Sequence, residues 1–140
     1  MVEFFDDRGV QYFLEANSGL YGSPDLKPRL RELVYGGVTD ETILAELERG
    51  IGPFIDSVTV GADPGRDDIN KISFRHSEVT LDEVRAQFSD TFTIIPATVP
   101  VFGPNSGELS IPGIHKAGAI QTLLDHLGLD LADTMAYGDG

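Results

Sequence analysis

The pattern that most limits the fold lies at the end of the sequence. Four apolar residues recur at the i, i+3, i+4 and i+7 spacing of one helix face: Ile120, Leu123, Leu124 and Leu127. Gly128 follows directly, at the position where a left-handed glycine typically ends a helix. Residues 134–137 then predict a short buried strand, closed by a Gly-Asp-Gly turn. Residues 114–140 are therefore predicted to form a helix–strand unit.

Two charged residues lie at the ends of this unit. Lys116 is at the predicted start of the helix, and Asp139 follows the predicted strand. A lysine and a carboxylate placed in this way suit one anionic site linked to a metal ion, because carboxylate oxygens are ligands that Mg²⁺ prefers. Spacing alone favours the simpler interpretation, an ordinary helix–strand unit with a solvated lysine and aspartate.

The residues of this unit resemble the haloacid dehalogenase-like hydrolases, and among them the Cof-type sugar-phosphate phosphatases. The third motif of that family is a lysine at the head of such a helix, which Lys116 matches. The fourth motif is a Gly-Asp-x-x-Asn-Asp run, and Gly138 and Asp139 match its opening before the sequence stops at Gly140. The first motif, Asp-x-Asp-x-Thr with its nucleophilic aspartate, has no match in these residues, and the second-motif Ser or Thr is expected to be missing too.

The resemblance implies a role for each matching residue. Lys116 would offset charge on the transferring phosphoryl group, and Asp139 would be a ligand of Mg²⁺. It further implies a truncated phosphatase of small phosphorylated metabolites, with a cap in residues 1–112 that gates substrate access and a fragment of the catalytic core in residues 113–140. Without the nucleophilic aspartate, we predict that this polypeptide alone has no turnover.

The rest of the chain alternates short strands with helices. Strands are predicted at residues 10–16, 20–21, 57–60, 69–75, 92–96, 98–102 and 108–111. Helices are predicted to end near residue 8 and to begin near residues 26, 39 and 80. This order predicts an α+β fold, an antiparallel sheet covered on one face by helices, followed by a helix–strand piece of a Rossmann-like core. Pro112 and Gly113 are the best domain boundary.

Three local predictions can be checked directly. Strands 57–60 and 69–75 are predicted to form a hairpin. The second long helix is predicted to begin with Thr39 as its cap, to bury a stripe that includes Ile43 and Ile51, and to stop at Gly52-Pro53. Thr80 and Glu83 have the spacing of a capping box.

The net charge excludes some classes of partner. The chain carries 23 acidic and 10 basic residues, a net charge of −13. Such a field repels nucleic acid and anionic membrane surfaces, which need clustered Lys and Arg. The sequence lacks an apolar run of the roughly 20 residues that a membrane span needs, a signal peptide and any cysteine, so the simplest placement is cytoplasmic.

Two further residues are candidates for substrate contact. Arg66, in the loop of residues 61–68, could reach an anionic ligand, although a solvated hairpin turn is the favoured interpretation of that loop. His115 precedes Lys116 and could lie near a phosphate, although it is otherwise a loop histidine. A zinc site is not expected, because the three histidines stand apart and have no cysteine partners.

Two alternatives remain open. The chain could be an autonomous α+β domain that binds a small ligand without catalysis, or a protein that assembles through its tail. The apolar residues of the tail would be exposed without a catalytic core around them. We therefore expect residues 114–140 either to fold back on the rest of the chain or to pair with another copy.

Overall fold

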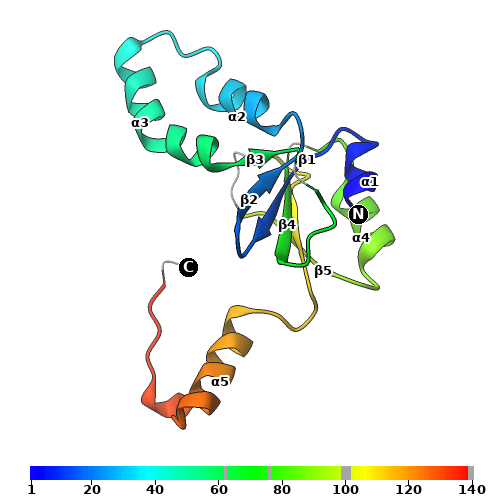
Figure 1. Ribbon diagram of the computed structural model, residues 1–140, viewed down its shortest axis with the longest axis vertical. Coiled ribbons are helices and arrows are strands. Elements are labelled where there is room, and N and C mark those ends of the chain that lie inside the picture. Colours follow the sequence, from blue (N-terminus) through cyan, green and yellow to red (C-terminus); the bar gives the residue numbers. More distant parts are fainter. Residues whose placement is uncertain (62, 76, 99–101, 139–140) are drawn as a thin grey trace.

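The computed structural model describes residues 1–61, 63–75, 77–98 and 102–138 (Figure 1). Its helices are α1 Val2–Asp6, α2 Leu26–Tyr35, α3 Glu41–Ser57, α4 Leu81–Phe88 and α5 Lys116–Leu127, followed by a short 3₁₀ turn at Leu131–Asp133. Its strands are β1 Gln11–Ala16, β2 Gly19–Gly22, β3 Thr59–Val60, β4 Ile69–Arg75, β5 Thr93–Pro96 and β6 Gly107–Ser110. This α+β arrangement confirms the predicted fold class.

The six strands of the described residues form one sheet in the order β3-β2-β1-β4-β6-β5. Every neighbouring pair is antiparallel except β2 and β3, which run parallel, so the sheet is mixed. β1 and β4, which are far apart in the sequence, lie together at its centre. Residues that will form a site can therefore come from distant segments of the chain.

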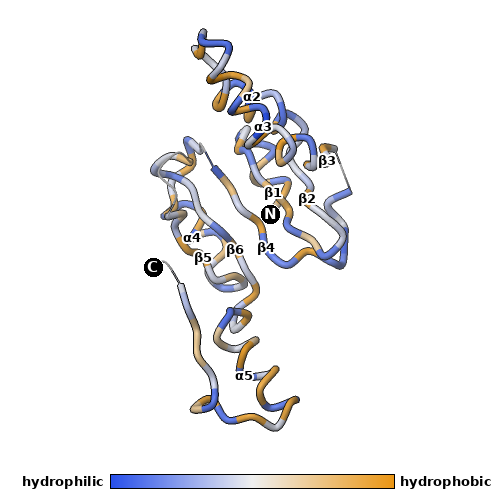
Figure 2. The backbone as a smooth tube through the Cα atoms, turned by 90° about the vertical axis from the view of Figure 1, so that its left-hand side faces the viewer, coloured by the Kyte–Doolittle hydropathy of each residue, from blue (hydrophilic) through white to orange (hydrophobic). Residues whose placement is uncertain are grey.

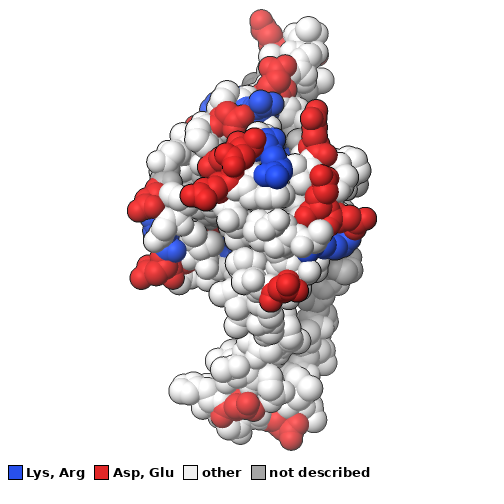
Figure 3. All heavy atoms as spheres, turned by 90° about the vertical axis from the view of Figure 1, so that its right-hand side faces the viewer, with Lys and Arg blue, Asp and Glu red and all other residues white. Residues whose placement is uncertain are grey.

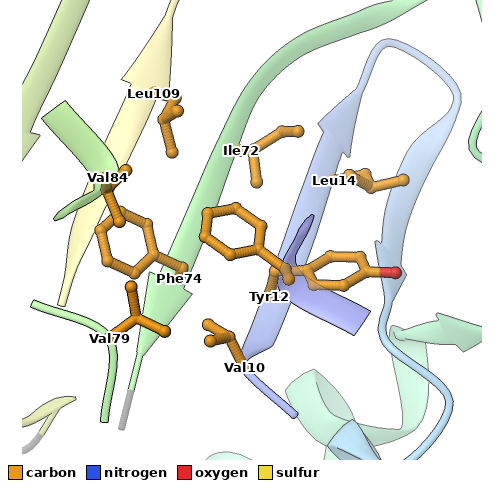
Figure 4. Close-up of a cluster of buried hydrophobic side chains, with 9 residues drawn as sticks. Val10, Tyr12, Leu14, Ile72, Phe74, Val79, Val84 and Leu109 are labelled. Atoms are coloured by element: carbon orange, nitrogen blue, oxygen red, sulfur yellow. The ribbon is translucent and has the colours of Figure 1, made fainter. Parts of the chain in front are cut away.

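One face of the sheet carries the main hydrophobic core. Tyr12 and Leu14 of β1 and Ile72 and Phe74 of β4 point to this face, where helices α1 and α4 cover them (Figure 4). The ring of Phe5 from α1 stacks on that of Phe74 with centroids 5.3 Å apart. Burial of each such side chain stabilises the fold by about 1.5–3 kcal/mol. The predicted inward orientation of Ile72 and Phe74 is confirmed.

Helix α4 begins as its sequence predicts. The Thr80 hydroxyl accepts from the Glu83 backbone N–H at 3.2 Å, and the Glu83 carboxylate accepts from the Thr80 N–H at 2.8 Å. This capping box satisfies two backbone donors that a helix start otherwise leaves unpaired. Val84, one turn later, is fully buried against the core. The local signal and the packing thus fix the same helix.

A second, smaller core joins the sheet to the helical hairpin of α2 and α3. Phe13 points to the face opposite Tyr12 and Leu14, and it packs with four residues of the hairpin and the connection that follows it: Leu26, Leu30, Ile55 and Val58. These contacts lie at one end of the sheet, and the hairpin projects beyond it (Figure 1). Much of that face is therefore not covered by helix.

Helix α3 differs from its prediction in three ways. Its cap is the carboxylate of Asp40, which accepts from two backbone N–H groups, and not the Thr39 hydroxyl. It continues through Pro53 to Ser57, and the burial of Ile55 and Val58 beyond the proline offsets the cost of the lost helix bond. Ile43 is 48% exposed, since only the far end of the helix packs on the sheet.

The predicted hairpin of residues 57–60 with 69–75 is wrong. β3 pairs in parallel with β2 at the sheet edge, and β2 and β1 lie between β3 and β4. The connection between them turns back across the end of β1, where the Asn17 N–H donates to the Asp68 carbonyl at 3.0 Å. The alternation of both strands was visible in the sequence, but their pairing depends on the position of α3.

The tail differs from its prediction as well. α5 ends at Gly128, which has the expected left-handed conformation with φ 66°. Residues 134–138 form no strand, and Met135 and Tyr137 are 77% and 91% exposed. A strand needs a neighbour for its backbone hydrogen bonds, and these residues have none within the described part of the tail. The predicted Gly-Asp-Gly turn extends into residues 139–140, and the predicted strand 98–102 into residues 99–101, which lie outside the described residues.

Candidate functional site

The sheet face opposite the main core carries a group of polar side chains. Alternate residues of a strand point to opposite faces, so the residues between the core positions lie here together. They are Glu15 of β1, Lys71, Ser73 and Arg75 of β4, and Glu108 of β6. We call this set the open face. In the register of the sheet, Ser73 lies between Phe13 and Glu108, and Lys71 lies opposite Glu15.

Lys71 joins the two carboxylates of the open face. Its Nζ lies 3.3 Å from Glu15 Oε1 and 3.0 Å from Glu108 Oε2. Ser73 Oγ donates to Glu15 Oε1 at 2.6 Å. Partial burial opposes the charge of Lys71, but the hydrogen bond to Glu108 and the attraction of both carboxylates outweigh it and raise the pKa of the ammonium. These groups form a fixed polar network across three strands.

Arg75 lies at the other end of the same strand and is only 2% exposed. Its Nε and Nη2 donate to the side-chain oxygen of Gln11 at 3.3 and 3.2 Å. Its Nη1 has no hydrogen-bond partner among the described residues. Burial lowers the pKa of the guanidinium, but an arginine stays protonated at neutral pH.

A cavity of about 290 Å³ lies over the open face. Its polar lining is Glu15, Ser73, Arg75 and Glu108. The rest of its lining includes Phe13 from β1, Phe54 from α3 and Phe102 from the segment before β6. Such a combination of apolar walls with a few converging polar groups is typical of a small-molecule site. A larger cavity, about 470 Å³, lies beside the first residues of the chain, and its lining includes Glu3, Asn70 and Lys71.

Arg66 has internal partners. Its guanidinium bonds to the Asp68 carboxylate, donates from Nη2 to Ser18 Oγ at 2.6 Å, and lies 4.1 Å from the centroid of the Tyr21 ring. These contacts tie the connection before β4 to the turn between β1 and β2. Because Asp68 offsets the charge of Arg66, contact with a substrate anion stays a prediction for this residue.

His115 and Lys116 lie together at the start of α5. His115 is the N-cap, and its Nδ1 accepts from the Gly118 backbone N–H at 3.0 Å. Lys116 is the first residue of the helix and is exposed. Within residues 1–138, apart from the short gaps, no hydrogen bond or ion pair joins this helix start to Arg66. The structure therefore does not bring the predicted site residues into one cluster.

The metal prediction depends on a residue outside the described part of the chain. Asp139 lies beyond residue 138. Among the described residues, no group of three or more His, Asp or Glu side chains could hold a metal ion. The role of Asp139 as a Mg²⁺ ligand therefore stays a prediction.

The open face was not singled out from the sequence. The alternation in residues 69–75 indicated that Ile72 and Phe74 point inward, and the same alternation places Lys71, Ser73 and Arg75 together on the other face. The position of these three side chains on one face could therefore have been predicted from the sequence. The contribution of Glu15 and Glu108 could not, because it depends on which strands flank β4.

The chain belongs to the haloacid dehalogenase-like hydrolases, whose family model matches residues 1–140. A comparison with curated proteins gives no significant match. Among the described residues, no helix is both long and apolar enough to cross a membrane.

Solved structures share the fold at low sequence identity. A haloacid dehalogenase-like hydrolase from B. subtilis is 16% identical with a TM-score of 0.61, and the match covers 98% of this chain and 51% of that chain. A sugar phosphatase of HAD subclass IIB is 15% identical with a TM-score of 0.59, covering 100% and 46%. A phosphatase of the same superfamily from Bacteroides thetaiotaomicron is 16% identical with a TM-score of 0.52, covering 99% and 44%. This chain thus spans about half the length of these solved structures.

Proposed function

We propose that this chain is the cap and an adjoining core segment of a Mg²⁺-dependent phosphatase that hydrolyses small phosphorylated metabolites such as sugar phosphates. The observation that carries the proposal is the match of the hydrolase family over residues 1–140. The sugar phosphatase among the similar structures supports the substrate class. In this proposal the cap is residues 1–112 and the core segment is residues 113–140.

The open face would bind the alcohol part of the substrate. The carboxylates of Glu15 and Glu108 can accept hydrogen bonds from sugar hydroxyls, and Ser73 can donate one or accept one. The rings of Phe13 and Phe54 offer apolar surface to the carbon faces of a sugar. Lys71 holds both carboxylates in place, so this part of the site is organised before a ligand binds.

Lys116 would lie beside the phosphoryl group and offset its charge, and His115 would lie close to it. Asp139 would be one ligand of Mg²⁺, which polarises phosphoryl oxygens when it is bound. The nucleophile would have to come from residues other than these 140, so we expect the chain alone to have no turnover. Gating of substrate access would follow from movement of the cap over the core.

The net charge of −13 disfavours a nucleic acid or an anionic membrane surface as the partner. It is compatible with a small ligand that is bound by local groups. The cavity over the open face also fits a second candidate, a domain that binds a small ligand without catalysis. The two candidates differ in whether the gene supplies a nucleophile.

The test uses the gene that contains this chain, expressed with its flanking codons. We expect its product to release inorganic phosphate from sugar phosphates when Mg²⁺ is present and to stop when EDTA is added. Lys116→Ala should lower kcat about 100-fold or more, because a preorganised cation is lost from the phosphoryl group. Lys27→Ala is the matched control, since Lys27 is a cation whose Nζ bonds to the Asp56 carbonyl. Full activity in the Lys116 variant, or no phosphate release by the wild type, would contradict the proposal.

A further inference from the structure

Arg75 is a buried cation whose charge is not offset by a neighbouring carboxylate in the described residues. Burying a charge is costly unless it is paired, so buried guanidinium groups normally contact carboxylates. Here the side-chain partner is the neutral amide of Gln11. The two N–H groups of Nη1 are left for another acceptor. Because Arg75 also lines the open-face cavity, that acceptor can be a ligand.

The nearby carboxylates do not serve Arg75. Glu15 and Glu108 bond to Lys71, and Glu15 also accepts from Ser73. The ion pairs of the described residues place no carboxylate oxygen within 4.0 Å of the guanidinium of Arg75. The cavity therefore has acceptors for hydroxyl groups over Lys71 and Ser73, and an unpaired cation beside them.

Two aromatic rings lie beside this buried cation. The guanidinium carbon of Arg75 lies 6.0 Å from the centroid of Phe13 and 5.7 Å from that of Phe102. Ring faces attract a cation weakly, so they offset part of its charge. In a site of low dielectric, a hydrogen bond from a charged donor to an oxyanion is stronger than in water.

From this arrangement we infer that the open-face cavity takes a polyol with an anionic group, a carboxylate or a phosphate, and that Arg75 Nη1 donates to that anion. The inference rests on the proposed function and narrows it. The substrate would carry a second acidic group besides the phosphoryl group that is removed, as phosphorylated sugar acids and sugar bisphosphates do. Glu15, Ser73 and Glu108 would meet its hydroxyl groups.

The first test measures binding to this 140-residue chain by calorimetry. The probes are gluconate, inorganic phosphate and glucose at equal ionic strength. We expect at least one of the two anions to bind at least tenfold more tightly than glucose. Tighter binding of gluconate assigns the site to a carboxylate, and tighter binding of phosphate assigns it to a phosphate. Equal or weaker binding of both anions compared with glucose would overturn the inference.

The second test replaces the cation. Arg75→Met should weaken anion binding at least tenfold, whereas the melting temperature without ligand should stay the same or rise, because an unpaired buried charge is removed. Lys27→Ala should leave anion binding unchanged, because Lys27 is a cation outside this cavity whose Nζ bonds to the Asp56 carbonyl. A lower melting temperature together with unchanged anion binding would mean that Arg75 only supports the fold.

Two measurements remain decisive if Arg75→Met does not fold. In the wild type, gluconate or phosphate should shift the Arg75 Nε–H signal in an NMR spectrum, whereas glucose should not. In the product of the gene expressed with its flanking codons, 6-phosphogluconate should exceed glucose 6-phosphate at least tenfold in kcat/KM if the site binds a carboxylate, and fructose 1,6-bisphosphate should do so if it binds a phosphate. Equal hydrolysis of all three compounds would overturn the inference while the proposed phosphatase stands, and no hydrolysis of any phosphate ester would contradict the proposed function itself.

Discussion

The carboxylate of Asp68 accepts two parallel hydrogen bonds from the guanidinium of Arg66, Nε to Oδ1 at 2.9 Å and Nη2 to Oδ2 at 3.1 Å. The Ser18 hydroxyl and backbone N–H donate to the same carboxylate. Asp68 thus fastens the connection before β4 to the turn between β1 and β2, at the end of the sheet away from Arg75. It lies in a sequence run of turn residues that carries no sign of such a contact.

This contact makes stability depend on acid. The hydrogen bonds from Arg66 and Ser18 lower the pKa of Asp68 from 3.8 to about 2. A carboxyl whose pKa is lower in the folded state stabilises the fold above its unfolded pKa, and that stabilisation is lost as the pH falls from about 4 to about 2. We expect Asp68→Asn to lower the urea midpoint at pH 7. Between these two pH values the urea midpoint of the variant should decrease less than that of the wild type. Asp90→Asn, at an exposed carboxylate after α4, is the control. If it weakens the pH dependence of the urea midpoint as much as Asp68→Asn does, the assignment of that dependence to Asp68 is contradicted.

Gly107 begins β6 where the sheet has no room for a side chain. A Cβ there would lie 2.7 Å from the Ile95 carbonyl oxygen and 3.0 Å from the Phe74 ring. Neither a paired strand nor a buried ring can move away freely, so Gly107→Ala should lower the free energy of unfolding by about 1–3 kcal/mol. Gly50→Ala should raise it by up to about 1 kcal/mol, because that helical site has nothing within 4 Å. Urea unfolding at pH 7 measures both, and equal effects would show that the site at Gly107 can relax.

The cap of α5 can be tested separately from any catalytic role of the residues beside it. His115→Ala removes the acceptor of the Gly118 N–H, which should destabilise the first turn by roughly 1 kcal/mol, as loss of other side-chain caps does. The change should appear as faster amide hydrogen exchange at residues 118–122. His115→Ser restores an acceptor and should restore protection. Unchanged exchange in the alanine variant would mean that the helix start is held by other contacts.

Most of the apolar stripe of α5 is uncovered in the described structure, and of its four residues only Leu124 is buried. Ile120, Leu123 and Leu127 are 44%, 55% and 57% exposed, and the helix lies away from the sheet (Figure 2). Few charged side chains lie over this part of the molecule on the face that Figure 3 shows. The tail therefore does not fold back on the sheet through this stripe, and pairing with another copy stays a prediction.

We expect the 140-residue chain to self-associate through this stripe as its concentration rises. Leu123→Glu with Leu127→Glu should abolish the association, because each change places a charge in the apolar contact. Gln121→Glu is the control, since Gln121 lies outside the stripe and bonds to Asp125. Sedimentation velocity over a concentration series measures the effect. A wild-type chain that stays monomeric at its highest soluble concentration would contradict the prediction.

The sequence was sufficient to predict the features that depend only on residues close together along the chain. The capping box at Thr80, the left-handed Gly128 and the alternation that buries Ile72 and Phe74 were all predicted and are confirmed. Each depends on backbone geometry within a few residues. The family could also be predicted from the sequence, because a few residues of a short motif, Lys116 among them, identify it.

Predictions failed where a distant contact decides the outcome. Burial of Ile55 against the sheet carries α3 past Pro53, and the path of that helix then places β3 beside β2. The open face has the same origin, because Glu15 and Glu108 meet only through the order of β1, β4 and β6. The contact of Arg66 with an anionic ligand stays a prediction. Its pairing with Asp68 was not predicted, because the geometry of that pair depends on Ser18 in the turn between β1 and β2. The roles of Lys116 and Asp139 stay predictions.

The two outer strands of the sheet have a consequence for how the protein avoids aggregation. A long, flat outer strand offers unpaired N–H and C=O groups on which another chain can build a further strand. Here one outer strand, β3, has only two residues, and the other, β5, ends in Pro96, which has no N–H to donate. Addition of a strand from another chain is therefore disfavoured at both edges of the sheet. The predicted self-association through the apolar stripe of α5 would therefore not extend the sheet.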